Sequence, residues 1–380
     1  MDLIPRRQFL QTTALAPLVL AAWPRRLRAD SPQQFIRMKS PQNLEWNFAS
    51  LGGRFITFDR SLYVRNHFAM PKIDRDKWRL KVEGAVERPL ELSLNDIVKL
   101  PSKTRPLLLE CAGNGRVFLT PPAKGVAWQL GAVGNAEWTG VPLADILDKA
   151  GVKKSAVEVV LEGADSGAVA DPQSPGPVPF ARSLPLDKAK SPEVLLAYKM
   201  NTRDLMAEHG APLRAVVGGW YGMASIKWLT RIIVVEKPHR GFFQAVDYCY
   251  FERQNGLASV VPITAMQVKS QIAQPAIGDG VLSGMPCRVT GAAWAGEADI
   301  TKVEVSVDGG KNWHEAALDD KTAPFCWRLW HWDWKDPKPG KATLMSRATD
   351  SKGRTQPMER NPDFRNYMIH HVLPVEVEVK

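Results

Sequence analysis

Hydrophobic and polar positions follow two different patterns along this chain. Between about residues 35 and 260, short apolar or alternating runs are interspersed with short segments of helical periodicity. From about residue 263 the helical segments stop and period-two alternation remains. The change predicts an α+β fold: a mixed α+β domain at residues 30–262, followed by a β-sandwich of immunoglobulin type at residues 263–380.

The first region contains signals for both kinds of element. Ser93 or Asn95 caps a predicted helix at 94–100, and a second helix begins at Pro142 and ends at Gly151. Strands are predicted at 78–86, 105–109, 157–161, 194–197, 213–217 and 229–235. Residues 165–180 are rich in proline, glycine and serine, which predicts an irregular exposed loop that is either a lid or a passive insertion.

The second region is predicted to contain strands alone. Residues 302–307 and 342–349 alternate, and Asp308-Gly309-Gly310 predicts a hairpin turn before a return strand at Trp313. Six tryptophans indicate either a homodimer surface or simple core and capping positions: Trp294, Trp313, Trp327, Trp330, Trp332 and Trp334.

The amino terminus resembles an export signal. Arg6-Arg7-Gln8-Phe9-Leu10 precedes an apolar stretch at 14–23, which Pro17 interrupts and which is too short to span a bilayer. We expect a twin-arginine signal peptide at residues 1–29, a periplasmic location and no membrane span in the mature form. The alternative is an ordinary basic terminus.

Composition is that of a globular protein of about two domains, with 380 residues, 44% hydrophobic and 24% charged. The net charge is +10, but the first 29 residues hold five arginines and one aspartate, so the remainder carries +6. Because no dense Lys/Arg run is interleaved with aromatics, the pattern disfavours nucleic acid and favours an anionic substrate or an acidic redox partner.

The four cysteines limit the metal chemistry. Cys111, Cys249, Cys287 and Cys326 form no Cys-x-x-Cys pair, which argues against a zinc ribbon, a cysteine-ligated iron–sulfur cluster and covalent haem attachment. Cys287 and Cys326 are predicted to form either a disulfide or two free thiols.

Cys111 is the strongest candidate for chemistry. It follows the predicted strand at 105–109 and precedes Gly113 and Gly115, whose backbone freedom permits a sharp turn. The nearby Arg116 favours the thiolate, the form that binds metals. The arrangement predicts a soft metal held by Cys111 beside a bound anion; the alternative is a buried structural cysteine.

Further motifs occur in a recognisable order. They are Val64-Arg65-Asn66-His67, Gly163-Ala164-Asp165, His209-Gly210-Ala211-Pro212-Leu213-Arg214, Ser225-Ile226-Lys227-Trp228-Leu229 and Asp247-Tyr248. Together with Glu110-Cys111-Ala112-Gly113-Asn114, they resemble the sulfite oxidase and sulfite dehydrogenase family of molybdopterin enzymes over nearly all of the mature chain.

The resemblance implies a role for each matching residue. Cys111 is expected to bind the molybdenum, and the catalytic set is expected to be Cys111, Arg65, Arg116, Tyr248, Trp128 and Arg365. Cofactor contacts are expected from Val64, Arg65, Asn66, His67, Phe68, Asp165, His209, Arg214, Ser225, Ile226 and Lys227. Gly115 stands where the family often has a second arginine, and Arg360 is an alternative to Arg365 as the third substrate arginine.

The implied activity is oxidation of sulfite to sulfate at a molybdopterin that carries one molybdenum. Electrons would pass singly to a separate cytochrome c, with no haem in this chain, and residues 263–380 would form a homodimer. Two alternatives remain at this point: a molybdopterin-dependent sulfoxide reductase, and a non-catalytic exported binding protein.

Overall fold

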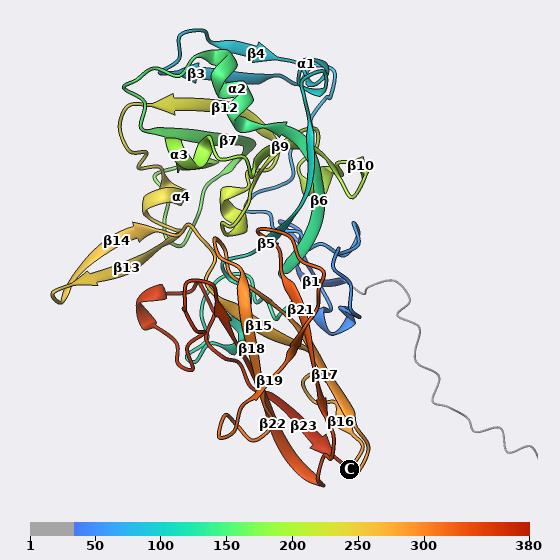
Figure 1. Ribbon diagram of the computed structural model, residues 1–380. Coiled ribbons are helices and arrows are strands. Elements are labelled where there is room, and N and C mark those ends of the chain that lie inside the picture. The colour runs from blue at the N-terminus through green and yellow to red at the C-terminus, as the bar shows by residue number, and fades with distance from the viewer. Residues whose placement is uncertain (1–33) are drawn as a thin grey trace, which may run out of the picture. The chain divides into compact units, whose positions relative to one another are not determined.

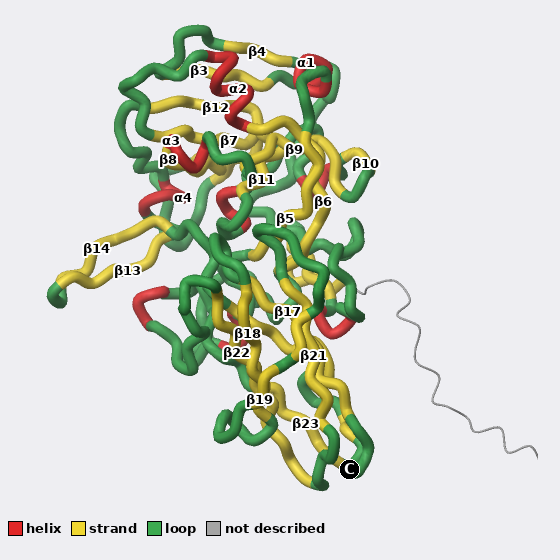
Figure 2. Tube along the Cα trace, viewed as in Figure 1, coloured by secondary structure: helices red, strands yellow, loops and turns green. Residues whose placement is uncertain are grey.

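The computed structural model describes residues 34–380, which lie within one structural unit (Figure 1). Strands dominate this part of the chain and its helices are short (Figure 2). Within these residues no helix is long and apolar enough to cross a membrane. The predicted signal peptide lies outside the described residues.

Two five-stranded sheets form the first region. One has the order β10-β9-β6-β5, with β11 also paired to β9. Its strands are β5 (Lys103–Glu110), β6 (Val133–Pro142), β9 (Val194–Met200), β10 (Arg203–Asp204) and β11 (Arg214–Val217). The other has the order β4-β3-β12-β7-β8. Its strands are β3 (Leu80–Gly84), β4 (Leu90–Leu92), β7 (Glu158–Gly167), β8 (Val178–Pro185) and β12 (Leu229–Val235).

Two predicted helices form for the expected reasons. Ser93 and Asp96 make a reciprocal capping box at the start of α1 (Leu94–Val98), so Ser93 rather than Asn95 is the cap. Pro142 precedes α2 (Leu143–Ala150), which ends at Gly151 with φ +71°. The remaining helices are α3 (Leu186–Ala189) and α4 (Phe242–Ala245), with 3₁₀ turns η1 (Phe48–Ser50), η2 (Arg116–Phe118), η3 (Ala207–His209), η4 (Gly222–Ala224) and η5 (Pro362–Phe364).

The loop predicted at 165–180 is shorter than expected. Strand β7 continues through Gly167 and β8 begins at Val178, with Ser166 paired to Pro179 beyond an irregularity in the register. Glycine and proline are depleted in strands, so the sequence of this segment does not indicate the pairing. Asp165 therefore lies within β7, at the irregularity in its pairing with β8.

The second region consists of two sheets around a separate apolar core that includes Val289, Val303, Val305 and Leu344. Their orders are β15-β17-β21-β20 and β16-β23-β22-β18-β19. The strands are β15 (Lys269–Gln274), β16 (Gly280–Val281), β17 (Cys287–Trp294), β18 (Ile300–Ser306), β19 (His314–Glu315), β20 (Ala317–Leu318), β21 (Arg328–Trp334), β22 (Gly340–Asp350) and β23 (Val375–Val379). Strand β18 pairs with β19 across the predicted turn, which confirms that hairpin.

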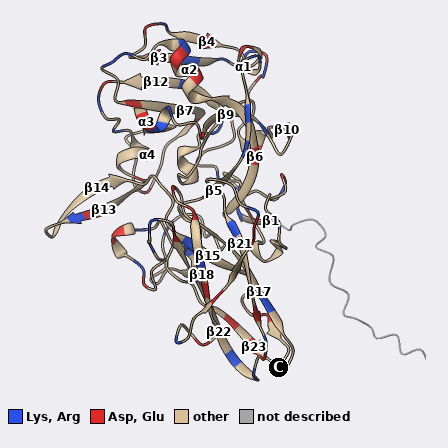
Figure 3. Cartoon of the chain, viewed as in Figure 1, with Lys and Arg blue, Asp and Glu red and all other residues tan. Residues whose placement is uncertain are grey.

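Two further hairpins complete the fold. One pairs β1 (Gln34–Met38) with β2 (Asn43–Trp46), and the other pairs β13 (Cys249–Gln254) with β14 (Leu257–Pro262). Figure 1 shows the β13–β14 hairpin extending away from its neighbours. In Figure 3, short basic and acidic segments are scattered over both regions of the fold.

The structure bears on two alternatives that the sequence leaves open. Trp294, Trp327 and Trp330 are at most 2% exposed, so these three belong to the core and not to a partner surface. The thiols of Cys287 and Cys326 are both free, which agrees with the second of the two alternatives that the sequence leaves open.

Candidate active site

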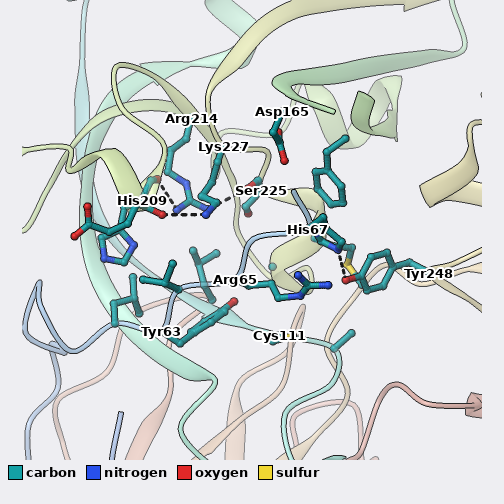
Figure 4. Close-up of a pocket in the computed structure, with 18 residues that line it drawn as sticks. Tyr63, Arg65, His67, Cys111, Asp165, His209, Arg214, Ser225, Lys227 and Tyr248 are labelled. Atoms are coloured by element: carbon teal, nitrogen blue, oxygen red, sulfur yellow. Dashed lines mark hydrogen bonds between the residues drawn. The ribbon is translucent and has the colours of Figure 1, made fainter. Parts of the chain in front are cut away.

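A pocket containing about 660 Å³ of empty space, part of it open to solvent, collects most of the predicted site residues (Figure 4). The predicted residues that line it are Val64, Arg65, His67, Cys111, Asp165, His209, Arg214, Ser225, Lys227 and Tyr248. Residues far apart in the sequence therefore face one cavity.

The turn after β5 places the Cys111 thiol on the pocket wall. Gly115 has φ +96°, as the predicted turn requires. Gly113 has no positive φ and is needed for space instead, because a Cβ there would lie 2.4 Å from Nη2 of Arg116. A Cβ on Gly125 would lie 2.7 Å from Nη1 of the same side chain. The Arg116 guanidinium is thus held between two glycines.

The protonation of Cys111 differs from the prediction. Burial raises the pKa of this thiol, while the charges of Arg116 and Arg65 lower it by less. The arginines act in the predicted direction, but desolvation is the larger effect. A bound metal cation would reverse this balance, because a coordinating thiol loses its proton.

Arg116 and Trp128 lie behind the wall of the pocket. Arg116 donates from Nε to the carbonyl of Asn366 at 3.2 Å and from Nη1 to that of Val126 at 2.9 Å. Trp128 is fully buried and packs edge-to-face on Tyr63, which lines the pocket. The sequence predicts both side chains at the cavity, whereas in the structure both lie one layer behind its wall.

Tyr248 and His67 form a hydrogen-bonded pair at the edge of the cavity. Tyr248 Oη and His67 Nε2 are 2.6 Å apart, and the imidazole stacks on Phe180 at 4.1 Å between centroids. Burial, with added repulsion from Arg65 and Lys227, holds the pKa of His67 well below its usual value. Burial also raises the pKa of Tyr248. Both groups are therefore neutral at neutral pH.

Arg65 extends toward this pair. Figure 4 shows its guanidinium pointing toward the Tyr248 hydroxyl. Its Nη1 donates to the carbonyl of Asn66, and it lies 3.4 Å from Oδ1 of Asn43. The charged fork is thus anchored from behind and presented to the cavity near Cys111.

Cations gather at the other end of the pocket. Arg214 donates from Nη1 and Nη2 to the carbonyls of His209 and Ser225, each at 3.0 Å. Lys227 donates to the carbonyl of Glu208 at 2.9 Å and to the Asn66 side chain. Burial, with repulsion from Arg214, holds the pKa of Lys227 well below its usual value. Asp165 and Glu208 line the same pocket and raise the pKa of Lys227, but by less than burial and Arg214 lower it, so a bound anion would favour the charged lysine.

Asp165 offers an unused acceptor in the same pocket. Its Oδ1 is buried and, among the described residues, has no hydrogen-bond partner. Burial raises the pKa of Asp165 to about 6. Burial and the charges of Arg214 and Lys227 lower the pKa of His209 to about 3. A ligand with N–H donors would satisfy the free carboxylate oxygen.

The remaining predicted residues do not line the pocket. Asn66, Phe68 and Ile226 are buried in the protein and are not among the residues that line it. Arg365 donates to Sγ of Cys249 at 2.9 Å, and Arg360 donates to the carbonyl of Tyr367 at 3.1 Å. Neither arginine reaches the cavity in this structure.

A buried polar network supporting the Cys111 turn was not predicted. Lys269 on β15 pairs with Glu110 at 3.0 Å, and Trp294 on β17 donates to the same carboxylate at 2.9 Å. Asn114 donates to Gln271, also on β15, at 3.1 Å. The only sequence signal was Glu110 and Asn114 flanking the turn, because their partners lie more than 150 residues away.

Two family models cover most of the described chain. The oxidoreductase molybdopterin-binding domain matches residues 67–243, and the Mo-co oxidoreductase dimerisation domain matches residues 260–378. The fold and the pocket are therefore those of a molybdopterin oxidoreductase.

Similarity to individual proteins identifies the family within the molybdopterin oxidoreductases. The chain is 35% identical to mitochondrial sulfite oxidase of Drosophila melanogaster over 90% of this chain and 62% of that protein, and 33% identical to sulfite oxidase of Gallus gallus over 85% and 72%. The crystal structure of the sulfane dehydrogenase SoxCD from Paracoccus pantotrophus superposes with a TM-score of 0.79 at 27% identity, covering 97% of this chain and 96% of that one. The chain belongs to the sulfite oxidase family.

Proposed function

We propose that this protein oxidises sulfite to sulfate at a molybdopterin cofactor and passes the electrons singly to a separate cytochrome c. The observation that carries the proposal is the pocket itself, which joins a single thiol and Arg65 at one end to a cluster of buried cations at the other. Family membership supports the same reading. The chain spans 62% of the length of the fly protein. Similarity to that longer protein therefore does not by itself assign its activity to this chain, and the proposal depends on the pocket.

The residues of the pocket fit a molybdopterin. Cys111 would be the protein ligand to molybdenum, since a soft thiolate suits such a metal. Arg214, Lys227 and His209 would face the phosphate, and the free oxygen of Asp165 would accept from ring nitrogens. When bound, the cofactor supplies two-electron oxygen-atom transfer at molybdenum.

The residues beside Cys111 would handle the substrate. Arg65 presents a permanently charged fork that can hold two oxygens of a small oxyanion. Arg116 adds positive charge from behind the wall. Tyr248 keeps its proton and can donate a hydrogen bond to an oxygen, with His67 as the neighbour able to exchange that proton.

The finer architecture and location belong to the same proposal. We assign residues 30–262 to the cofactor domain and residues 263–380 to an immunoglobulin-type sandwich that forms a homodimer, which the matched dimerisation domain supports. The twin arginines at 6 and 7 support export to the periplasm, where soluble cytochromes c operate.

A second candidate substrate is sulfane sulfur. The structural match to the sulfane dehydrogenase covers nearly all of both chains, whereas the fly sulfite oxidase extends well beyond this chain. Oxidation of a sulfane donor would use the same cofactor pocket.

One assay tests both candidates. Purified, molybdenum-loaded protein is mixed with oxidised cytochrome c and either sulfite or a persulfide, and cytochrome reduction is followed optically. Sulfite-dependent reduction with the higher kcat/KM supports the proposal. A higher kcat/KM for the persulfide supports the second candidate, and reduction of dimethyl sulfoxide by a dithionite-reduced sample without either oxidation would indicate a reductase.

A further inference from the structure

Residues 366–368, just after η5, close over the turn that carries Cys111. The amide of Met368 donates to the carbonyl of Ala112 at 2.7 Å, and the carbonyl of Asn366 accepts from Nε of Arg116 at 3.2 Å. These residues lie in the region matched by the dimerisation domain, outside the stretch matched by the molybdopterin-binding domain. The second region of the chain thus completes the wall behind the site.

Tyr367 lies at the centre of this closing segment and contacts two of the groups proposed to act on substrate, Arg116 and Tyr248. The Arg116 guanidinium lies 5.3 Å from the centroid of the Tyr367 ring, within cation–π range. The Tyr248 ring lies 4.8 Å from the same ring, tilted by 37°. The Tyr367 hydroxyl donates to Oδ1 of Asp247 at 2.5 Å, which fixes the ring in its plane. The three contacts leave this ring little freedom to rotate.

We infer that Tyr367 is a positioning residue that holds the Arg116 guanidinium and the Tyr248 phenol in fixed relation to each other. The inference rests on the proposed function, in which these two groups act on one oxyanion. Arg116 has no carboxylate partner in the described residues, and its guanidinium packs against the backbone of two glycines, which have no side chain to hold it. The aromatic face of Tyr367 supplies the side that those glycines do not. Without that face, Arg116 would sample other directions, and small displacements of a charged group weaken its interaction with a small anion.

Two substitutions separate the parts of this arrangement. Tyr367→Leu removes the aromatic face and should raise both KM for sulfite and the dissociation constant for sulfate about tenfold, with a smaller change in kcat. Tyr367→Phe keeps the ring but loses the Asp247 hydrogen bond, so it should leave sulfate binding within about twofold and lower kcat about threefold through Tyr248. The matched control is Tyr250→Leu, since the Tyr250 ring packs on Phe364 next to the same segment and touches neither Arg116 nor Tyr248.

Sulfate binding is measured by equilibrium dialysis on oxidised, molybdenum-loaded protein, and turnover by cytochrome c reduction. Because dialysis needs no turnover, a wild type that binds sulfate without oxidising sulfite would reject the proposed function and still allow the Leu variant to decide this inference. A sulfate dissociation constant for Tyr367→Leu equal to that of Tyr250→Leu would overturn it, as would a wild type that binds no sulfate. Molybdenum content and thermal melting establish that each variant is folded and loaded. Should Tyr367→Leu fail to fold, an unchanged kcat in Tyr367→Phe would overturn the inference.

Discussion

The two ends of the pocket are built in different ways. At the end proposed for the cofactor phosphate, Arg214 and Lys227 bind carbonyls of His209, Ser225 and Glu208, all within twenty residues of one another along the chain. At the Cys111 end, the turn is held by segments from β15, β17 and the carboxy-terminal part, more than 150 residues away. Lys227 also donates to the distant Asn66 side chain, but the first end is built mainly from one short segment, whereas the second is assembled by the whole fold.

This difference indicates how precisely the side chains at each end are held in position. A cluster of cations ordered by nearby carbonyls is set by its own short segment, and the bound anion offsets the repulsion among its charges. The thiol end must keep one sulfur, one guanidinium and one phenol aligned for a small substrate, so it is fixed from several sides. Perturbations at the Cys111 end should therefore damage the chemistry most, and those at the other end should act on binding and stability.

The largest expected effect is from Cys111→Ser. A hydroxyl is a harder ligand than a thiolate and stays protonated near pH 7, so sulfite turnover should fall by roughly a thousandfold, about 4 kcal/mol in the barrier. The fold and the pterin content should be retained, because the cation end is untouched. Cys287→Ser, at a half-buried thiol on β17, is the matched control. Turnover of Cys111→Ser close to that of the control would remove the proposed ligand.

The next effect is on the network that supports the turn. Lys269 and Glu110 are each 2% exposed as side chains, so Lys269→Met would leave a buried carboxylate without its counter-charge and should cost about 3–5 kcal/mol of unfolding free energy. Denaturant titration measures it. Arg288→Met is the control, because its ion pair with Asp333 is largely exposed and should contribute below about 1 kcal/mol. Equal costs for the two variants would contradict the proposed support.

The same contrast explains what the sequence could reveal. Helices α1 and α2, the β18–β19 hairpin and the Gly115 turn depend on neighbouring residues, and local patterns predicted them. Ten site residues found in one cavity came from short motifs whose order matched a family. The pairing of Glu110 with Lys269, the position of Tyr367 and the direction of Arg365 depend on contacts between distant segments. No local pattern encodes these, so they required the fold. The Arg116 charge lowers the Cys111 pKa as the sequence predicts, but burial raises it by more, and burial is a property of the folded chain that no local pattern encodes.

A smaller effect concerns pH and the cation end. Burial raises the pKa of Asp165 to about 6 from an ordinary 3.8, so the folded protein disfavours the carboxylate. The contribution of Asp165 to the unfolding free energy is fully present below about pH 4. About 3 kcal/mol of unfolding free energy is lost as the pH rises through 6. In cofactor-free protein, Asp165→Asn should match wild type near pH 4 and be more stable by about that amount near pH 7.5. Urea unfolding across this range measures it, with the exposed Asp145→Asn as control. A gap that does not grow with pH would show that the carboxylate is not penalised by burial.

The smallest effect distinguishes charge from shape at the Cys111 end. Arg116→Gln keeps a hydrogen-bonding group for the carbonyls of Val126 and Asn366 but removes the positive charge, so KM for sulfite should rise about tenfold, or about 1.4 kcal/mol. Electron transfer from the reduced protein to cytochrome c should be unchanged. Because the lost attraction is electrostatic, KM should also depend less on added salt than in wild type. Arg288→Gln alters the net charge equally at a distant exposed site and should leave KM and its salt dependence unaltered. If KM and its salt dependence change equally in both variants, the charge of Arg116 acts only through the net charge of the protein. The Cys111 end would then contain no specific anion site.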